Sequence, residues 1–170
     1  MTSTTTAIRA ACTAQAALPT PLGVLCVART DAGLAGAWFD GQRHHPGALP
    51  APGRPDDALL REAAAQLAAY FAGRTTPFDV PLDLHGTPFQ RAVWDALLAI
   101  GRGQTRRYAD IAHAVGSAQA LRAVGAAIGK NPLSIVVPCH RVIGSDGSLT
   151  GYAGGLPRKR ALLALEGVAA

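Results

Sequence analysis

The first half of the chain alternates short apolar runs with polar turn residues. Residues 21–29 and 34–39 are apolar and flank the segment Asp31-Ala32-Gly33, a combination typical of a β-hairpin. Residues 44–55 are rich in proline and glycine and are expected to form a loop. Residues 56–72 show helical spacing and open with two acidic residues, which suit the positive end of a helix dipole. This pattern predicts a small β-sheet with one helix packed on it.

The second half shows helical spacing over most of its length. Thr87 and Pro88 suit the N-cap and the first turn of a helix that runs through residue 101. Two shorter helices are expected at about 108–115 and 118–129. The tight turn between them contains Gly116, so this pair predicts a helix-turn-helix.

The rest of the second half predicts a buried segment, a last helix and the boundaries between domains. Residues 134–143 form an apolar run interrupted by Pro138, which we expect to be buried and extended, and a final helix is expected over 157–166. A proline-rich linker over 77–88 separates the two halves. The expected organisation is a flexible N-terminus over residues 1–17, an N-terminal α+β domain over 18–80 and a C-terminal domain over 81–170.

Composition restricts the class of protein. The chain has 170 residues, of which 49% are hydrophobic, so it can bury a core and does not resemble a disordered chain. Three cysteines are too few, and odd in number, for a disulfide framework, which suits a reducing compartment. No apolar run reaches membrane-spanning length, and the N-terminus lacks the pattern of a signal peptide. We therefore expect a cytoplasmic protein with no membrane partner.

Charge is distributed unevenly along the chain. Residues 1–85 carry six Arg and seven acidic residues, a balance of −1, whereas residues 86–170 carry ten Lys or Arg and four acidic residues, a balance of +6. A basic half favours a polyanionic partner, of which nucleic acid is the commonest. A basic surface without a partner is the alternative that charge alone leaves open.

Cys139 is the candidate nucleophile. It stands in an apolar run beside His140 and Arg141, and a thiol reacts as the thiolate, which basic or cationic neighbours make accessible. The alternative is a buried structural cysteine, because free cysteines are among the most buried residues. In an extended run, side chains 139 and 140 point to opposite sides, so a bridging water is the natural link between them. His140 then needs an acidic partner, for which the second half offers Asp95, Asp110, Asp146 and Glu166.

The motif Pro138-Cys139-His140-Arg141, preceded by Asn131-Pro132, resembles the active-site signature of the O6-alkylguanine-DNA alkyltransferases. The similarity runs through residues 86–167 and, more weakly, through 20–40. Within the family, the chain resembles the bacterial type that has no adaptive-response regulatory domain. The resemblance implies an α+β protein. A ribonuclease H-like sheet domain would precede a helical domain that bears a winged-helix-like helix-turn-helix, the DNA-binding surface and the active site.

The resemblance also implies roles for individual residues. Cys139 would accept the alkyl group, and His140 would deprotonate the Cys139 thiol through a water. Glu166 would orient His140, and Asn131 would brace the turn before the segment that carries Cys139. Arg122 would fill the space that a flipped nucleotide leaves in the duplex. The DNA-binding residues implied are Tyr108, Arg122, Ala123, Ala126, Ala127 and Arg141. The substrate-pocket residues implied are Ile128, Ser134, Val142, Tyr152, Ala153 and Lys159.

The expected reaction is direct reversal of DNA damage, a stoichiometric and irreversible transfer of the alkyl group from O6-alkylguanine to Cys139, with O4-alkylthymine as a second candidate substrate. No cofactor and no metal are expected, because a sulfur nucleophile and a protonatable leaving group suffice and Cys12 and Cys26 lack zinc-ligand spacing. The expected partner is double-stranded DNA, bound by a monomer, and cooperative binding along the duplex is an open alternative. The alternatives are a lesion-binding protein without transfer, a helix-turn-helix regulator and a cysteine hydrolase.

Three positions depart from the family pattern. Arg107 stands where many relatives have Ser before the tyrosine, so a phosphate contact there is in doubt. Ala153 replaces a Ser of the mammalian lid, which removes a hydroxyl contact to the substrate. Ser134 stands where mammalian members carry Pro, which puts the binding of bulky benzyl-type substrates in doubt.

Overall fold

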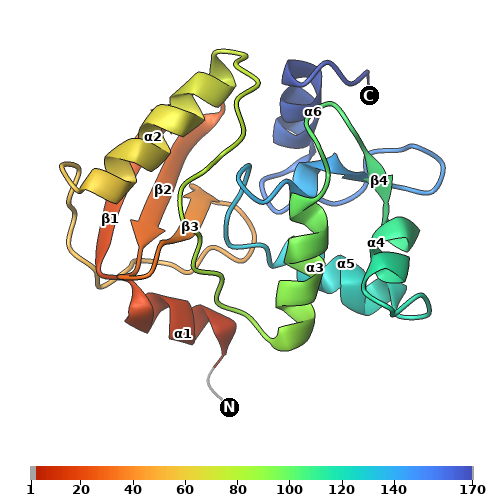
Figure 1. Cartoon of the computed structure of the whole chain (residues 1–170), viewed down its shortest axis with the longest axis horizontal. Helices are drawn as coiled ribbons and strands as arrows, with labels where there is room; N and C mark the ends of the chain where they lie inside the picture. Colours follow the sequence, from red (N-terminus) through yellow and green to blue (C-terminus); the bar gives the residue numbers. More distant parts are fainter. Residues whose placement is uncertain (1–2, 170) are drawn as a thin grey trace.

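The structure is a computed structural model that describes residues 3–169, and it places the two halves of the chain side by side (Figure 1). A three-stranded sheet and the helices packed on it form one half, and the helices that follow in the chain form the other. Residues 72–87 cross between the halves as an extended connection. None of the helices in the described part of the chain is long and apolar enough to cross a bilayer.

The sheet of the first half is antiparallel in the order β1-β2-β3. Strands β1 (Ala14–Thr20), β2 (Gly23–Arg29) and β3 (Leu34–Phe39) pair so that Ala17 faces Cys26 and Val27 faces Ala37. The pairing of β2 with β3 confirms the predicted hairpin. Helix α2 (Ala58–Phe71) contacts all three strands, as expected from its apolar face.

The N-terminus differs from the expectation of a flexible segment over residues 1–17. Helix α1 (Thr4–Ala11) is capped by the Ser3 hydroxyl, which accepts from the Thr6 amide, and β1 begins at Ala14. The sequence prediction missed this order because it is created by tertiary packing. Ile8 and Cys12 are buried together with Trp38 of β3. Residues 1 and 2 lie outside the described part of the chain.

The helices of the second half form where their caps predict them. Helix α3 (Pro88–Leu98) begins with a capping box in which the Thr87 hydroxyl accepts from the Gln90 amide and the Gln90 side chain accepts from the Thr87 amide. Helices α4 (Tyr108–Ala114) and α5 (Leu121–Gly129) form the predicted helix-turn-helix, although α5 begins three residues later than expected. Helix α6 (Leu156–Leu165) closes the fold.

The sheet also holds the segment that carries Cys139. The Ala37 amide donates to the Pro132 carbonyl at 2.8 Å, and the Ser134 amide donates to the Ala37 carbonyl at 3.0 Å. The outer edge of β3 therefore continues onto residues 132–134, and one hydrophobic core includes residues from both halves. Because backbone hydrogen bonds and a shared core join the halves, the position of Cys139 depends on both.

The segment 134–143 is buried as expected, but it is not extended. Ile135 adopts φ +74°, and Cys139–Arg141 form a single 3₁₀ turn, η1, before the short strand β5 (Val142–Ile143). Strand β5 pairs in parallel with β4 (Arg106–Arg107). A left-handed backbone at a β-branched residue costs of order 1–3 kcal/mol and persists only where the surroundings impose it. Apolar periodicity carries no signal for such a turn.

Candidate active site

Cys139 opens into a cavity of about 330 Å³ between the two halves. Its thiol lies at the inner wall, because the residue is only 6% exposed. Tyr108 at the start of α4 lies on one side, and Tyr152 and Ala153 lie in the loop before α6. The other lining residues are Arg43, His44, Gly125, Ala126, Ile128, Gly129, Lys130 and Gly151.

Asn131 fixes the turn that presents the sulfur. Its side-chain amide donates to the Val137 carbonyl at 2.7 Å and lies 3.2 Å from Cys139 Sγ, while its carbonyl oxygen accepts from the Leu133 amide at 2.9 Å. Asn131 is buried, so these bonds satisfy groups that water does not reach. The predicted brace therefore has the contacts that bracing requires.

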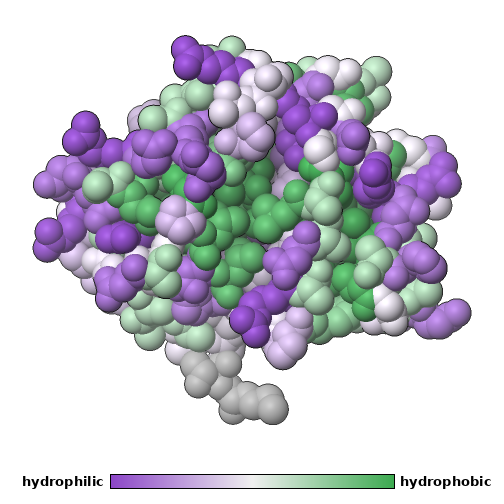
Figure 2. Space-filling model, in the orientation of Figure 1, coloured by the Kyte–Doolittle hydropathy of each residue, from purple (hydrophilic) through white to green (hydrophobic). Residues whose placement is uncertain are grey.

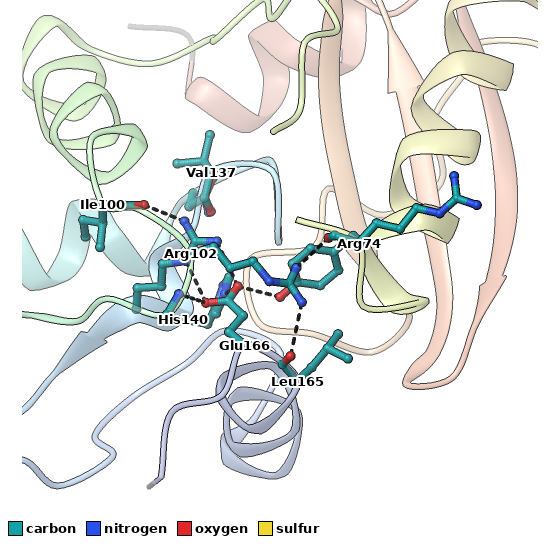
Figure 3. Close-up of polar contacts among 11 residues, drawn as sticks. Arg74, Ile100, Arg102, Val137, His140, Leu165 and Glu166 are labelled. Atoms are coloured by element: carbon teal, nitrogen blue, oxygen red, sulfur yellow. Dashed lines mark hydrogen bonds and ion pairs between the residues drawn. The ribbon is translucent and has the colours of Figure 1, made fainter. Parts of the chain in front are cut away.

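Behind the sulfur, His140 and Glu166 form a buried pair (Figure 3). His140 Nε2 lies 2.7 Å from Glu166 Oε1, and both side chains are fully excluded from solvent. The other ring nitrogen, Nδ1, has no hydrogen-bond partner within residues 3–169. Of the four acids that the sequence left open as partners of His140, the structure selects Glu166 at the C-cap of α6.

Arg141 is not at the surface, which corrects its expected role in DNA binding. It is 9% exposed, and its Nε and Nη2 donate to the two oxygens of Glu166, both at 2.9 Å. Its Nη1 donates to the Ile100 carbonyl at 2.5 Å. The 3₁₀ turn directs His140 and Arg141 toward the same carboxylate, so Arg141 holds the buried pair together.

Burial sets the protonation states of this group. Burial raises the pKa of the Cys139 thiol above its ordinary value of 9.0, although Asn131 and the charge of Lys159 oppose the change. Burial likewise lowers the pKa of His140, and the bond to Glu166 opposes this. Burial alone would raise the pKa of Glu166, but the bonds from His140 and Arg141 outweigh it and hold that pKa well below its usual range. The site thus combines a neutral thiol, a neutral imidazole and an ionised carboxylate.

Lys159 supports the wall of the cavity and does not line it. The residue is fully buried, and its ammonium group donates to the carbonyls of Val142, Thr150 and Gly151. The Tyr108 hydroxyl donates to the same Thr150 carbonyl at 2.8 Å. Burial raises the pKa of Tyr108, so its hydroxyl keeps its proton. The loop beside the cavity is therefore held by two side chains, Lys159 and Tyr108.

Helix α5 divides its side chains between surface and core. Arg122, Ala123 and Ala126 are exposed, and Ala126 also lines the cavity. Ala127 was expected to contact DNA, but it is buried at 3% exposure and its carbonyl accepts from Trp94 Nε1. Ile128 is buried and lines the cavity, as expected of a pocket residue.

Two expected pocket residues lie behind the cavity. Ser134 is 2% exposed, and its hydroxyl lies 3.2 Å from the Gln42 side-chain oxygen. Val142 is fully buried, and its carbonyl accepts from Lys159. Ser134, Val142 and Lys159 are absent from the cavity lining, although the sequence placed them in the substrate pocket. They support the walls of the cavity from behind and do not face into it.

The sequence analysis missed the contribution of the first half. Arg43 and His44 line the cavity, and the Arg43 amide donates to the Ala153 carbonyl at 2.9 Å. Tyr70 of α2 donates its hydroxyl to Glu166 Oε1 at 2.7 Å. Arg43 and His44 lie in an irregular loop, and Tyr70 fits the apolar spacing of its helix. Neither pattern predicts contacts across more than 90 residues.

A second cavity, of about 340 Å³, lies on the other side of the segment 134–143, which carries Cys139. Phe78, Val80, Leu98, Ile100 and Val136 are among its apolar residues. Figure 2 shows hydrophobic residues gathered across the middle of this face, between the sheet and α3. Within residues 3–169, no cluster of three His, Cys, Asp or Glu side chains is arranged to hold a metal ion.

The sequence matches two family models that divide the chain as the fold does. Residues 15–84 match the ribonuclease-like domain of 6-O-methylguanine DNA methyltransferase, and residues 88–168 match the DNA-binding domain of the same family.

Relatives match over most of their length. A methylated-DNA–protein-cysteine methyltransferase of Mycolicibacterium paratuberculosis is 50% identical over 146 residues, 86% of this chain and 87% of the relative. One of Methanosarcina barkeri is 46% identical over 150 residues, 88% of this chain and 94% of the relative. The crystal structure of Mycobacterium tuberculosis OGT in complex with DNA superimposes with a TM-score of 0.81 and 47% identity, covering 90% of this chain and 92% of that one.

Proposed function

This chain belongs to the 6-O-methylguanine DNA methyltransferase family, and from that membership we propose that Cys139 takes the alkyl group from the O6 atom of a guanine in DNA. The chain is a methylated-DNA–protein-cysteine methyltransferase that repairs DNA by direct reversal, and DNA is its partner. The acceptor and the residues that serve it are the proposal. The observation that carries it is Cys139, at the wall of an open cavity and backed by a buried His–Glu pair.

The thiol must lose its proton before it can attack. Burial favours the neutral thiol, so the free protein holds little thiolate near neutral pH, and a base is required. His140 is neutral, is oriented by Glu166 through Nε2, and has Nδ1 available. We infer that Nδ1 takes the thiol proton through one water and that the ionised Glu166 stabilises the resulting imidazolium.

The thiolate then displaces guanine from the alkyl carbon. The S–C bond forms as the C–O6 bond breaks, the electron pair of that bond goes to the guanine, and a proton restores the neutral base. Tyr108 keeps its proton in the free protein and lies in the cavity wall, so it is the residue we propose as the donor to the base. The phenolate that this transfer leaves then regains a proton from solvent. The product is a thioether, which ordinary acid–base groups do not hydrolyse, so one chain repairs one base.

The base must leave the duplex to reach Cys139. Arg122, on the exposed side of α5, is the side chain we propose to fill the vacated space, and Ala123 and Ala126 would allow close approach to a groove. These small side chains offer no hydrogen bonds to base edges, which favours a lesion scanner over an operator-binding regulator.

Specificity for the alkylated base, the oligomeric state and the location in the cell remain predictions. We expect one protomer to act on each lesion. Cooperative binding along DNA, activity on O4-alkylthymine and a cytoplasmic location stay as expected from the sequence. Titration of undamaged duplexes of increasing length tests for cooperative binding, because cooperativity raises the affinity per site as the duplex becomes longer.

The test is intact-mass analysis after incubation with a duplex that carries one O6-methylguanine. We expect the wild-type chain to gain the mass of one methyl group, located on Cys139 by peptide mapping, and Cys139→Ala to gain none while still binding the duplex. Cys26→Ala is a matched control, since Cys26 lies in β2, outside the cavity lining. A methyl group on another residue, or equal transfer by Cys139→Ala, would refute the assignment.

A further inference from the structure

Tyr70 connects the sheet half of the molecule to the buried pair behind Cys139. It lies in the last turn of α2 and is 5% exposed. Its ring packs against Phe71 and Phe78, with centroid distances of 5.5 and 5.8 Å. Its hydroxyl donates to Glu166 Oε1 at 2.7 Å, the same distance at which His140 Nε2 meets that oxygen.

Arg102 fixes the ring of Tyr70 from its face. The guanidinium carbon lies 4.9 Å from the ring centroid, within cation–π range. Its two terminal nitrogens donate to the Arg74 carbonyl at 3.1 Å and the Leu165 carbonyl at 3.2 Å (Figure 3). Arg102 thus joins the end of α2 to the end of α6, the two places from which Tyr70 and Glu166 extend. Arg102 therefore holds in place both partners of the hydrogen bond between the Tyr70 hydroxyl and Glu166.

The Glu166 carboxylate receives more donors than a hydrogen-bonded pair with histidine needs. Oε1 accepts from His140, Tyr70 and Arg141, and Oε2 accepts from Arg141 and, at 3.5 Å, from the Gly103 amide. An oxygen that shares its charge among three donors attracts each of them less strongly than it would attract one. The Tyr70 hydroxyl therefore competes directly with His140 for the same oxygen.

We propose that Tyr70 is a positioning residue for alkyl transfer, supplied by the N-terminal half, which fixes the Glu166 oxygen that orients His140. The inference rests on the proposed function, because it assigns Tyr70 a role in the deprotonation of Cys139. Without the hydroxyl, Oε1 would direct more of its charge to His140, and the pKa of the imidazole would rise. The other charged groups that face His140 are Arg141 and Lys159, and both are cationic.

The test compares Tyr70→Phe with the wild-type chain in single-turnover transfer from a methylated duplex. The rate is followed over a pH range of about 4 to 9, which extends well below the ordinary histidine value because burial lowers the pKa of His140. Phe keeps the ring and removes only the hydroxyl. The rate falls at acid pH as His140 becomes protonated. We expect the midpoint of this fall to move upward by about one pH unit in Tyr70→Phe, the size of shift that one hydrogen bond to a charged group produces. At a pH below the midpoint, the variant should be about tenfold slower.

Phe78→Leu is the matched control, because it disturbs the same aromatic packing without touching Glu166. We expect it to lower Tm and to leave the midpoint unchanged. A Tyr70→Phe profile that superimposes on wild type overturns the inference, and so does an equal loss of rate at every pH, which would make Tyr70 a packing residue only. If the wild-type chain transfers no methyl group to Cys139, the proposed function fails instead, so the two failures are distinguishable.

Discussion

The buried group behind Cys139 and the exposed side of α5 are held in opposite ways. Both carboxylate oxygens of Glu166 are hydrogen-bonded, and their partners His140 and Arg141 come from one 3₁₀ turn. Arg122 and Ala123 of α5, by contrast, are exposed. The difference indicates that reactivity is built into the folded chain, whereas DNA contact is completed only by the partner. Changes in the buried group should alter chemistry and stability together, and changes at Arg122 or Ala123 on the exposed side of α5 should alter neither in the free protein.

The largest effect is expected from Glu166→Gln. An amide cannot stabilise the imidazolium, and it leaves Arg141 buried without its counter-charge. We expect transfer to slow by about a hundredfold or more, equally on duplex and single-stranded substrates. Stability should fall by about 3 kcal/mol, as for a broken buried ion pair. Glu62→Gln, on the exposed side of α2, is the control for both rate and Tm. Retention of rate and Tm by Glu166→Gln would contradict the comparison.

Arg122→Ala should slow repair only where a duplex has to be opened. Extruding a base from a stack costs a few kcal/mol, and a side chain that fills the gap offsets part of it, so about a tenfold loss is expected on a methylated duplex. A single-stranded oligonucleotide with the same base needs no filling, and its rate should be unchanged. The quantity to measure is the ratio of the two rates, with Arg61→Ala of α2 as the control. Equal losses on both substrates would assign Arg122 to general electrostatic attraction.

The acid sensitivity of the fold should depend on Glu166. Because its pKa is lower in the folded chain than the ordinary 4.5, its contribution to stability is complete above that value and decreases as the pH falls below it. We expect wild type to lose about 2 kcal/mol of stability that Glu166→Gln does not lose over the same acid range. Urea unfolding at several pH values measures this. Parallel curves for the two proteins would show that other carboxylates control acid unfolding.

The smallest effect is expected from Tyr108→Phe, which lies where the two regions meet. The variant loses one hydrogen bond to the Thr150 carbonyl, about 1 kcal/mol, and the proposed proton donor to the base. We expect a loss of transfer rate of about fivefold, with binding of an undamaged duplex preserved. A full loss of DNA binding in Tyr108→Phe would place Tyr108 with Arg122, as a DNA contact first.

The parts of the fold that local signals determine could be predicted from the sequence. Thr87 and Gln90 form a capping box, and the start of α3 falls where it predicts. The turn between β2 and β3 and the helix-turn-helix at Gly116 follow from residues within a few positions of one another. The Cys139, His140 and Glu166 group could be assigned because its motif resembles that of a known family.

What could not be predicted depends on contacts between distant residues. Helix α1 is ordered by burial of Ile8 against Trp38, which lies 30 residues away. The turn at Ile135 contradicts the local preference of a β-branched residue, and the neighbouring Ser134 is hydrogen-bonded to Ala37 of the N-terminal sheet. Arg141 was expected at the surface because it is a cation in a basic half, but the turn of the backbone directs it inward to Glu166.

The hydrogen bond from the Arg43 amide to the Ala153 carbonyl sets the spacing between the two sides of the cavity with main-chain atoms alone. Replacement of either side chain changes the chemical character of the rim and leaves this spacing intact. Substitutions at positions 43 and 153 can therefore change which alkyl groups the cavity accepts without altering the width of its opening. Only a proline at position 43, which removes the donor, would alter both at once.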